Sequence, residues 1–467
     1  MITRKRFTRL TLVLAAAAAL AASYSLSAAA KPAPQDQTQQ KKPSYTLPEY
    51  NAFQAANSEK DPQARLKLLD AFVAKYPNST LMPYVDALYF TTYNQLKDYA
   101  KTIEYADKYV ALPDTQQYVQ VSEKLQMLQV RVQAFQAIFK QSDANAQDEA
   151  TKERDAALLG AHMLDSFAKP DSFKGADADW QNQKKPGLAF FYAAAGFADL
   201  QLKDNAAAIQ AFKNALTNKP DDAVSEYRLG LAYLQSTPPQ YLDGFWALAR
   251  AVDLKVPDSD KIKDYLQKQI LVYEQPGCDA QATDQLNELL QLAQNAPDRP
   301  TTWTIPSQAD LNQIRQSSNI LSVITDLSGG GDKAKQTWLA ICDAEFPEVV
   351  GKIIDIKPSD NYVEFLVYTG ASAQDMQAAT TPNMDVKVWT ATPPAGAMAG
   401  PASSADQVTP QPDITRLNKN EGIKFSGTIV SYDPSPFLLH WDQVKVDPSV
   451  IPPKGATTRR RGKSGGR

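Results

Sequence analysis

The sequence predicts two folds in series, an N-terminal α-solenoid of helix hairpins followed by a small five-stranded β-barrel. Three observations predict this multidomain α plus β class. Apolar residues recur at spacings of three and four between Tyr45 and Leu292, and two glycines lie 34 positions apart within that span. Strand-length runs rich in Val, Ile, Phe and Tyr follow residue 345. A chain of 467 residues is also too long for one ordinary core.

The N-terminus has the features of a secretory signal. Basic residues within the first nine positions precede an uncharged apolar run from Leu10 to Ala22, and small residues follow up to Ala30. We expect cleavage after Ala30, so that 1–30 is a signal peptide and the mature chain is periplasmic or extracellular. The alternative is an uncleaved anchor helix, because the run up to Ala30 is about long enough to span a bilayer. Residues 31–44 predict a flexible polar linker, and no later segment predicts a membrane span.

Helix-length segments joined by short links fill residues 45–295, the predicted solenoid. Asp, Pro and Asn interrupt the apolar pattern between the segments, as at the ends of DPQARLKLLDAFVAKYP and DYAKTIEYADKYVAL. Short links force consecutive helices to run antiparallel, so the segments are expected to pair into hairpins.

Small residues recur at fixed places in two of these hairpins. Gly196 and Gly230 are 230 − 196 = 34 positions apart, and each lies in the middle of a first helix. In the second helix of the first pair, Ala208, Phe212 and Ala215 share one face. Leu248 and Ala251 repeat the last two positions in the next pair, with Gly244 at the first. We expect the small side chains to let helix backbones approach closely while the large ones fill the space beside them.

This pattern resembles the tetratricopeptide repeat (TPR), a helix hairpin of 34 residues with small residues at these places and a proline at its end. The resemblance is good for 187–257, fair for 62–113, and weakens between 114 and 186. Asp199 departs from it, since the family usually has an aromatic residue at that place. The resemblance implies about four to six repeats, irregular in the middle.

The resemblance also implies a concave surface lined by the first helices. On the family's pattern, the positions facing this groove are Tyr84, Thr91, Asn94, Phe190, Phe197, Leu200, Tyr227, Leu231 and Leu234. This wall mixes apolar and aromatic residues with few charges, which favours an apolar or aromatic peptide face such as an amphipathic helix. It lacks the Lys and Asn set with which repeat domains bind a peptide's terminal carboxylate. The alternative is that these residues pack on neighbouring helices and bind nothing.

After residue 295 the pattern changes. Residues 296–344 predict a linker and connecting helices, and 345–448 predict five strands with a low-complexity loop at 391–413. Residues 449–467 are basic and Gly-rich, and predict a disordered tail.

The end of the strand region resembles the closing half of an OB-fold barrel. In that pattern a short helix ends in a glycine, and the next strand carries a glycine in its middle; Gly422 and Gly427 match these places. His440 lies between Leu439 and Trp441, and we expect it on the opposite barrel face from both.

The chain holds very few residues suited to metal binding. Two histidines and two cysteines cannot build a His-rich or Cys-rich metal site, and no metal or cofactor is predicted. Cys278 and Cys342 are 342 − 278 = 64 positions apart. They either form a disulfide, as exported proteins can, or remain two separate buried thiols.

One glycine-rich segment invites comparison with a phosphate-binding loop. SGGGDK lacks the G-x-x-x-x-G-K-[ST] spacing, and the segment before it is helix-like. We expect a flexible loop in which Asp332 caps the following helix.

These observations favour a binding protein over an enzyme. No nucleophile elbow and no H-E-x-x-H helix is present, and a net charge of −3 argues against nucleic acid as a partner. We expect a non-catalytic adaptor or scaffold of the bacterial cell envelope that binds another envelope or secreted protein in the groove. The sequence predicts no oligomeric state.

The alternative function is an enzyme accessory or carbohydrate-binding protein. Aromatic residues of the barrel would then stack on a glycan, and the candidates are Tyr362, Phe365, Tyr368, Trp389, Phe425, Tyr432 and Trp441. An exposed Trp389 or Tyr432 would favour this alternative, whereas a lined solenoid groove would favour a polypeptide.

Overall fold

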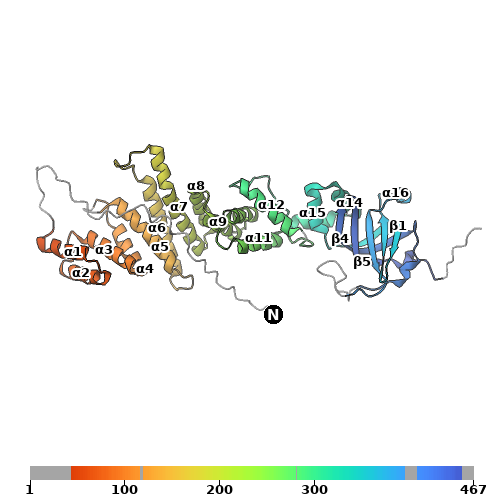
Figure 1. Ribbon diagram of the computed structural model, residues 1–467, viewed down its shortest axis with the longest axis horizontal. Coiled ribbons are helices and arrows are strands. Elements are labelled where there is room, and N and C mark those ends of the chain that lie inside the picture. The colour runs from red at the N-terminus through yellow and green to blue at the C-terminus, as the bar shows by residue number, and fades with distance from the viewer. Residues whose placement is uncertain (1–43, 116–118, 280, 395–407, 455–467) are drawn as a thin grey trace, which may run out of the picture. The chain divides into compact units, whose positions relative to one another are not determined.

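The computed structural model divides the chain into two compact units between Asp260 and Lys261. It describes residues 44–115, 119–279, 281–394 and 408–454. The first unit is an array of helices, and the second combines further helices with a closed barrel of five strands (Figure 1). This confirms the predicted multidomain α plus β class. The predicted signal, nearly all of the predicted linker and the end of the predicted tail lie outside the described residues.

Helices of the first unit pack against their neighbours in chain order. Their bounds are α1 Leu47–Ser58, α2 Pro62–Lys75, α3 Met82–Gln95, α4 Tyr99–Val110, α5 Val121–Ile138, α6 Ala146–Ser166, α7 Asp177–Leu202, α8 Asn205–Asn218, α9 Ala223–Gln235 and α10 Tyr241–Asp253. Within the ranges that the structure describes, no helix combines the length and the apolar character needed to cross a bilayer.

The links between these helices carry the residues that start and stop them. Asp61, Asp98 and Asp204 each accept a hydrogen bond from a backbone N–H in the first turn of α2, α4 and α8. The chain leaves α3 and α7 through Lys97 and Lys203, whose φ angles are 59° and 61°. This left-handed conformation ends a helix sharply, so the next helix begins within a few residues and folds back as a hairpin.

The predicted small residues lie where large side chains of the paired helix arrive. A Cβ added to Gly196 would lie 2.9 Å from the Phe212 ring, and one added to Gly230 would lie 2.7 Å from Leu248 Cγ. Such distances are too short for a real Cβ, so the observed helix separation requires glycine at both places. Ala208, Ala215 and Ala251 are fully buried beside them. Close packing of two helix pairs is therefore the physical reason for the 34-residue spacing.

The middle of the first unit, where the repeat pattern weakens, has longer helices and a buried ion pair. Helices α5, α6 and α7 contain 18, 21 and 26 residues. Arg131 of α5 pairs with Glu153 of α6, both of them buried, and with Asp107 of α4 at 2.8 Å. Burial raises the pKa of Glu153 to about 8, although the charge of Arg131 opposes that rise. A polar contact thus joins helices whose sequence lacks the regular small-residue set.

The second unit begins with helices that precede the barrel. Their bounds are α11 Ser259–Glu274, α12 Ala282–Asn295, α13 Gln308–Ser317, α14 Ile320–Gly329 and α15 Gly331–Ile341. The division of the chain places nearly all of α11 and the whole of α12 with the barrel, which differs from the predicted end of the solenoid at residue 295.

A disulfide explains why α11 and α12 group with the second unit. Cys278, in the link between them, is bonded to Cys342 at the end of α15, with Cα atoms 5.5 Å apart. Beside the bond, the N–H of Gly277 donates to the carbonyl of Leu339 at 2.8 Å. Of the two alternatives that the sequence left open for the cysteines, the structure contains the bridge.

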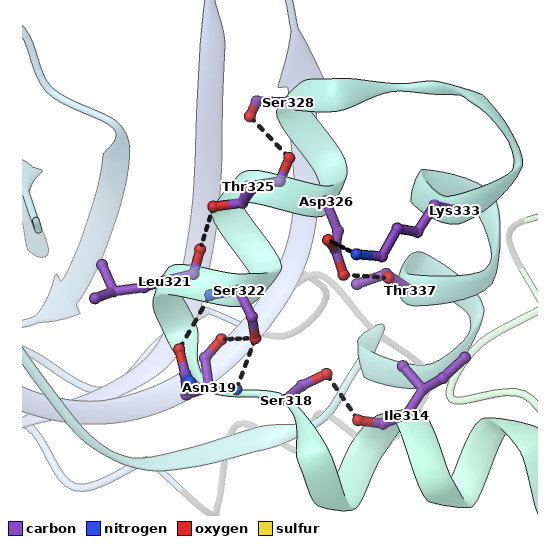
Figure 2. A network of polar contacts seen from close by, with 10 residues as sticks. All are labelled: Ile314, Ser318, Asn319, Leu321, Ser322, Thr325, Asp326, Ser328, Lys333 and Thr337. Atoms are coloured by element: carbon purple, nitrogen blue, oxygen red, sulfur yellow. Dashed lines mark hydrogen bonds and ion pairs between the residues drawn. The ribbon is translucent and has the colours of Figure 1, made fainter. Parts of the chain in front are cut away.

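The segment SGGGDK spans the end of α14 and the start of α15, and Gly330 alone lies between the two helices. Gly330 is the N-cap of α15 and has a φ of 69°, a conformation that favours glycine. The prediction that Asp332 caps this helix is wrong, because Asp332 lies within the first turn and no side chain bonds the cap. Lys333 pairs with Asp326 at 2.6 Å, and Thr337 donates to the same carboxylate at 3.2 Å (Figure 2). Lys333 therefore makes an ion pair between the two helices.

Five strands close into a barrel in the order β1-β2-β3-β5-β4. Their bounds are β1 Glu345–Pro358, β2 Tyr362–Tyr368, β3 Met384–Trp389, β4 Gly422–Pro434 and β5 Phe437–Val446. Neighbours pair antiparallel except β3 and β5, which run parallel. A short helix, α16 (Ala373–Ala378), lies between β2 and β3. The closed mixed barrel is compatible with the OB-like barrel that the sequence predicts.

Alternating residues fill the barrel interior. Leu439 and Trp441 are buried, and His440 between them is partly exposed, as predicted. Gly427 in the middle of β4 permits a close approach, since a Cβ there would lie 2.9 Å from Val444 Cγ2 and 3.3 Å from Val444 Cα.

The sequence predicts a disordered tail at 449–467, and the start of that range is too early. Residues 449–454 are described, and Val450 and Ile451 pack against the barrel core. Arg416 also bonds the carbonyl of Pro452. Apolar side chains after β5 therefore pack on the barrel within the part of the chain that was predicted to be a disordered tail.

Candidate functional site

The predicted groove residues lie on three first helices of the first unit. Tyr84, Thr91 and Asn94 belong to α3, Phe190, Phe197 and Leu200 to α7, and Tyr227, Leu231 and Leu234 to α9. All of them are half-buried, neither in the deep core nor fully exposed. Helix α7 contacts both α5 and α9, so the first helices of three successive hairpins are neighbours. A groove lined by first helices requires such neighbours, and α5, α7 and α9 meet this requirement.

Several of these residues also serve helix packing. The ring of Tyr84 lies 5.8 Å from that of Phe53 in α1. Leu200 packs against the buried cluster around Phe212, and Leu234 covers Gly244 of α10, where an added Cβ would lie 2.8 Å from it. For these positions the structure supports the packing alternative.

The remaining predicted residues differ in their surroundings. Phe190 lies next to Phe191, with ring centroids 5.4 Å apart. Thr91 donates its hydroxyl to the carbonyl of Ala87 in its own helix at 2.8 Å. The structure does not join Thr91 and Asn94 of α3 to the residues of α7 and α9.

Phe197 of α7 is the meeting point of side chains from three helices. The guanidinium carbon of Arg228, on α9, lies 4.6 Å from the centroid of the Phe197 ring, within the range of a cation–π interaction. Phe139, directly after α5, meets the same ring edge-on, with centroids 6.3 Å apart and an interplanar angle of 83°. Tyr227 lies beside Arg228 in α9, and burial raises its pKa while the charge of Arg228 lowers it. We call Phe139, Phe197, Tyr227 and Arg228 the Phe197 cluster.

Arg228 is surrounded by protein atoms but keeps some contact with solvent. Burial lowers the pKa of its guanidinium, and the charge of Asp222 partly opposes this. The residue is nevertheless of intermediate exposure. Within the part of the chain that the structure describes, no residue forms a hydrogen bond or an ion pair with Arg228, and its close contact is the Phe197 ring. A partly desolvated cation therefore lies in the middle of an aromatic surface.

The sequence predicted two members of the Phe197 cluster and missed the other two. Arg228 does not fall on a groove-facing position of the family's pattern, and Phe139 lies in the stretch where that pattern weakens. Their proximity depends on how α5, α7 and α9 stack, which no local spacing in the sequence reports.

The barrel aromatics are largely buried. Phe365, Phe425 and Trp441 are only 1% exposed, and Trp389 is 2% exposed. The indole N–H of Trp389 donates to the Asp442 carboxylate at 3.0 Å, which satisfies its polar group inside the protein. The glycan alternative called for an exposed Trp389 or Tyr432; the structure buries Trp389 and leaves Tyr432 partly exposed.

The three barrel tyrosines are partly exposed. Tyr432 packs on Trp338, with ring centroids 5.1 Å apart. Tyr362 has the ammonium group of Lys387 over its ring at 4.6 Å. A neighbouring side chain therefore covers part of each of these two rings.

His440 lies between two carboxylates on the outer side of the barrel. Its Nε2 is 3.0 Å from Asp433, and its Nδ1 is 3.6 Å from Asp385. These contacts, that with Asp385 foremost, raise the pKa of His440 above its usual value of 6.5, although burial lowers it. The imidazole thus joins β5 to β3 and β4. In the described ranges, no three His, Cys, Asp or Glu side chains are grouped so that they could hold a metal ion.

We compared the chain with known families, proteins and structures. No protein-family model and no curated protein matches it. Among solved structures, it is similar to the C-terminal part of a TPR repeat-containing protein from Cytophaga hutchinsonii. The sequence identity is 16%, the match covers 52% of this chain and 93% of that one, and the TM-score is 0.24. At this level of similarity the neighbour assigns no function to this chain.

Proposed function

We propose that this protein is an exported, non-catalytic adaptor whose first unit is a TPR-type solenoid that holds another polypeptide against its first helices. The observation that carries the proposal is the Phe197 cluster, in which half-exposed side chains from three neighbouring hairpins meet. Aromatic residues and arginine are enriched at the centres of protein interfaces, because they offer a large contact area and several hydrogen-bond donors. Apolar side chains beside the cluster, such as Leu231, would extend the contact.

The proposed partner is another envelope or secreted protein. This part of the proposal rests on the N-terminal sequence, in which a basic stretch, an apolar run and small residues up to Ala30 are typical of export. The burial of Trp389 counts against the carbohydrate-binding alternative, so we do not propose it as a second function.

A crosslinking capture experiment tests the proposal. The full chain is crosslinked in its native envelope as wild type and as the double variant Phe197→Ala, Tyr227→Ala. We expect the variant to lose the captured protein by about tenfold or more, because both rings belong to the centre of the contact. The matched control is Leu158→Ala, Leu159→Ala, which removes two exposed leucines, 43% and 40% accessible, from the second helix α6.

The control variant is expected to capture the partner like the wild type. Thermal unfolding of each variant shows whether the first unit remains folded. Equal capture by the wild type and by a folded Phe197→Ala, Tyr227→Ala variant would contradict the proposal.

A further inference from the structure

We infer that the polypeptide bound by the first unit carries an acidic side chain within an apolar stretch, and that its carboxylate pairs with Arg228. The inference rests on the proposed function and names the chemistry of the ligand. It starts from the one feature of the Phe197 cluster that aromatic packing does not explain, the placement of a positive charge there.

Other deeply placed arginines of the first unit have carboxylate partners. Arg131 pairs with Glu153 and Asp107, and Arg250 pairs with Asp253 at 3.2 Å. Arg228 differs, because no described residue forms an ion pair or a hydrogen bond with it. A crowded cation without a hydrogen-bonded or ion-paired anion is unfavourable, so the free energy of the site falls when a carboxylate bonds to it.

The geometry of Arg228 leaves its donors available. A guanidinium is planar and carries five N–H donors in that plane. The guanidinium carbon lies 4.6 Å from the centroid of the Phe197 ring, and no described residue accepts a hydrogen bond from the N–H donors, so these donors can meet an incoming group. A carboxylate matches this fork with two parallel hydrogen bonds.

The surroundings of Arg228 favour an internal acidic side chain over a chain terminus. The Phe197 ring contacts Arg228, the Phe139 ring contacts that of Phe197, and Tyr227 and Leu231 precede and follow Arg228 on α9. A bound segment that covers both sides must continue past the carboxylate with apolar residues in both directions. A C-terminal carboxylate would end the segment at Arg228 and leave part of this surface uncovered.

The chain's own segments outside the described residues fit this surface poorly. Residues 31–43 contain Asp36 among Pro, Gln and Lys, and residues 395–407 contain Asp406 after Ser and Ala. Neither acid is flanked by large apolar residues, so we assign the ligand to a second protein.

Selection from a displayed library tests the inference without knowledge of the natural partner. The probe is a phage library of random short peptides, selected on the immobilised chain from Lys31 onward, the expected mature protein. We expect the enriched peptides to share one Asp or Glu with large apolar residues on both sides. Two synthetic twins of the best peptide, one with the acid and one with the matching amide, are then titrated by fluorescence anisotropy.

The affinities of these twins locate the carboxylate. The amide twin should bind the wild type about tenfold to a hundredfold more weakly than the acid twin. The variant Arg228→Gln should bind both twins equally weakly, and Arg228→Lys should recover part of the difference, since it keeps the charge but not the planar fork. Arg154→Gln is the matched control, because Arg154 lies on α6 and pairs with Asp155 at 2.8 Å; it should bind like the wild type.

The outcomes separate the inference from the proposed function. If selected peptides need Phe197 and Tyr227 but show no acid, or bind Arg228→Gln like the wild type, the inference is wrong and the proposed function stands. If amidation of the peptide's C-terminus alone abolishes binding, the carboxylate is terminal and the inference is wrong. If the peptides ignore Phe197→Ala, Tyr227→Ala, or if none is enriched, both are wrong.

Discussion

The two units differ in which of their aromatic side chains remain near the surface. In the first unit Phe197 and Tyr227 remain half-exposed on neighbouring helices, whereas in the second unit Trp389 and Trp441 are buried. A helix satisfies its own backbone hydrogen bonds, so an array of helices can leave large side chains along one side. A five-stranded barrel closes on itself and uses every second residue of each strand as core. Aromatic content alone therefore does not locate a binding surface.

The largest expected effect is on the second unit, through its disulfide. The double variant Cys278→Ser, Cys342→Ser should lower the free energy of unfolding by about 4 kcal/mol, because the bond closes a loop of 64 residues in the unfolded chain. Calorimetry of the full chain measures the change. If the first unit alone binds the partner, the variant should capture it at the wild-type level. A loss of capture would contradict this division of roles between the two units.

Close helix packing in the first unit gives the next effect. Gly230→Val should destabilise this unit by about 3 kcal/mol, since its Cβ would lie 2.7 Å from Leu248 Cγ and 3.1 Å from the carbonyl oxygen of Gly244. The control is Gly329→Ala at the end of α14, where an added Cβ meets nothing within 4 Å. In limited proteolysis of the full chain, Gly230→Val should be cleaved in the first unit, whereas Gly329→Ala should resist cleavage like the wild type. Equal resistance of both variants would disprove the packing argument.

A buried carboxylate makes the stability of the second unit depend on pH. Glu274 is 0% exposed, and burial raises its pKa from 4.5 to about 7, although a hydrogen bond from Gln285 opposes the rise. The folded state therefore binds more protons than the unfolded state between these values, so stability is greatest below pH 4.5 and falls as pH rises to about 7. Glu274→Gln should remove this dependence and stabilise the protein at pH 8 by about 1–3 kcal/mol. Urea unfolding at pH 5 and pH 8 measures it, and an unchanged slope with pH would contradict the assignment.

The smallest effect concerns the outer side of the barrel. The contacts of His440 with Asp385 and Asp433 raise its pKa above 6.5. Its contribution to stability is fully present below pH 6.5 and is lost as pH rises through the raised value. His440→Gln should therefore destabilise the barrel by less than about 1 kcal/mol at pH 5.5, and by nothing measurable at pH 9. A larger loss at pH 9 than at pH 5.5 would show that the imidazole acts by packing.

The spacing of residues along the chain predicted the close packing within the helix hairpins and the alternation of side chains along β5. Gly196 and Gly230 fall where Phe212 and Leu248 arrive, and the period of 34 reports that contact directly. Alternation along β5 predicted that His440 points away from the barrel interior. In both cases one residue's neighbours along the chain decide which side it faces.

Features that depend on contacts between distant segments were not predicted. The sequence left the pairing of Cys278 with Cys342 open, because nothing within the intervening residues reports their approach. It placed the end of the solenoid at residue 295, whereas the structure groups α12 with the barrel. Arg228 was missed because its contact with Phe197 joins two hairpins, and Asp332 was assigned as a cap because acidic residues often are caps.

The most direct test of the central claim places a photocrosslinking amino acid at one position in each unit. One full-length variant carries it at Leu231 beside the Phe197 cluster, and the other at Tyr362 on the barrel, and both are irradiated in the native envelope. The account predicts a covalent adduct with a single protein from position 231 and none from position 362. An adduct from position 362 with none from position 231 would contradict it.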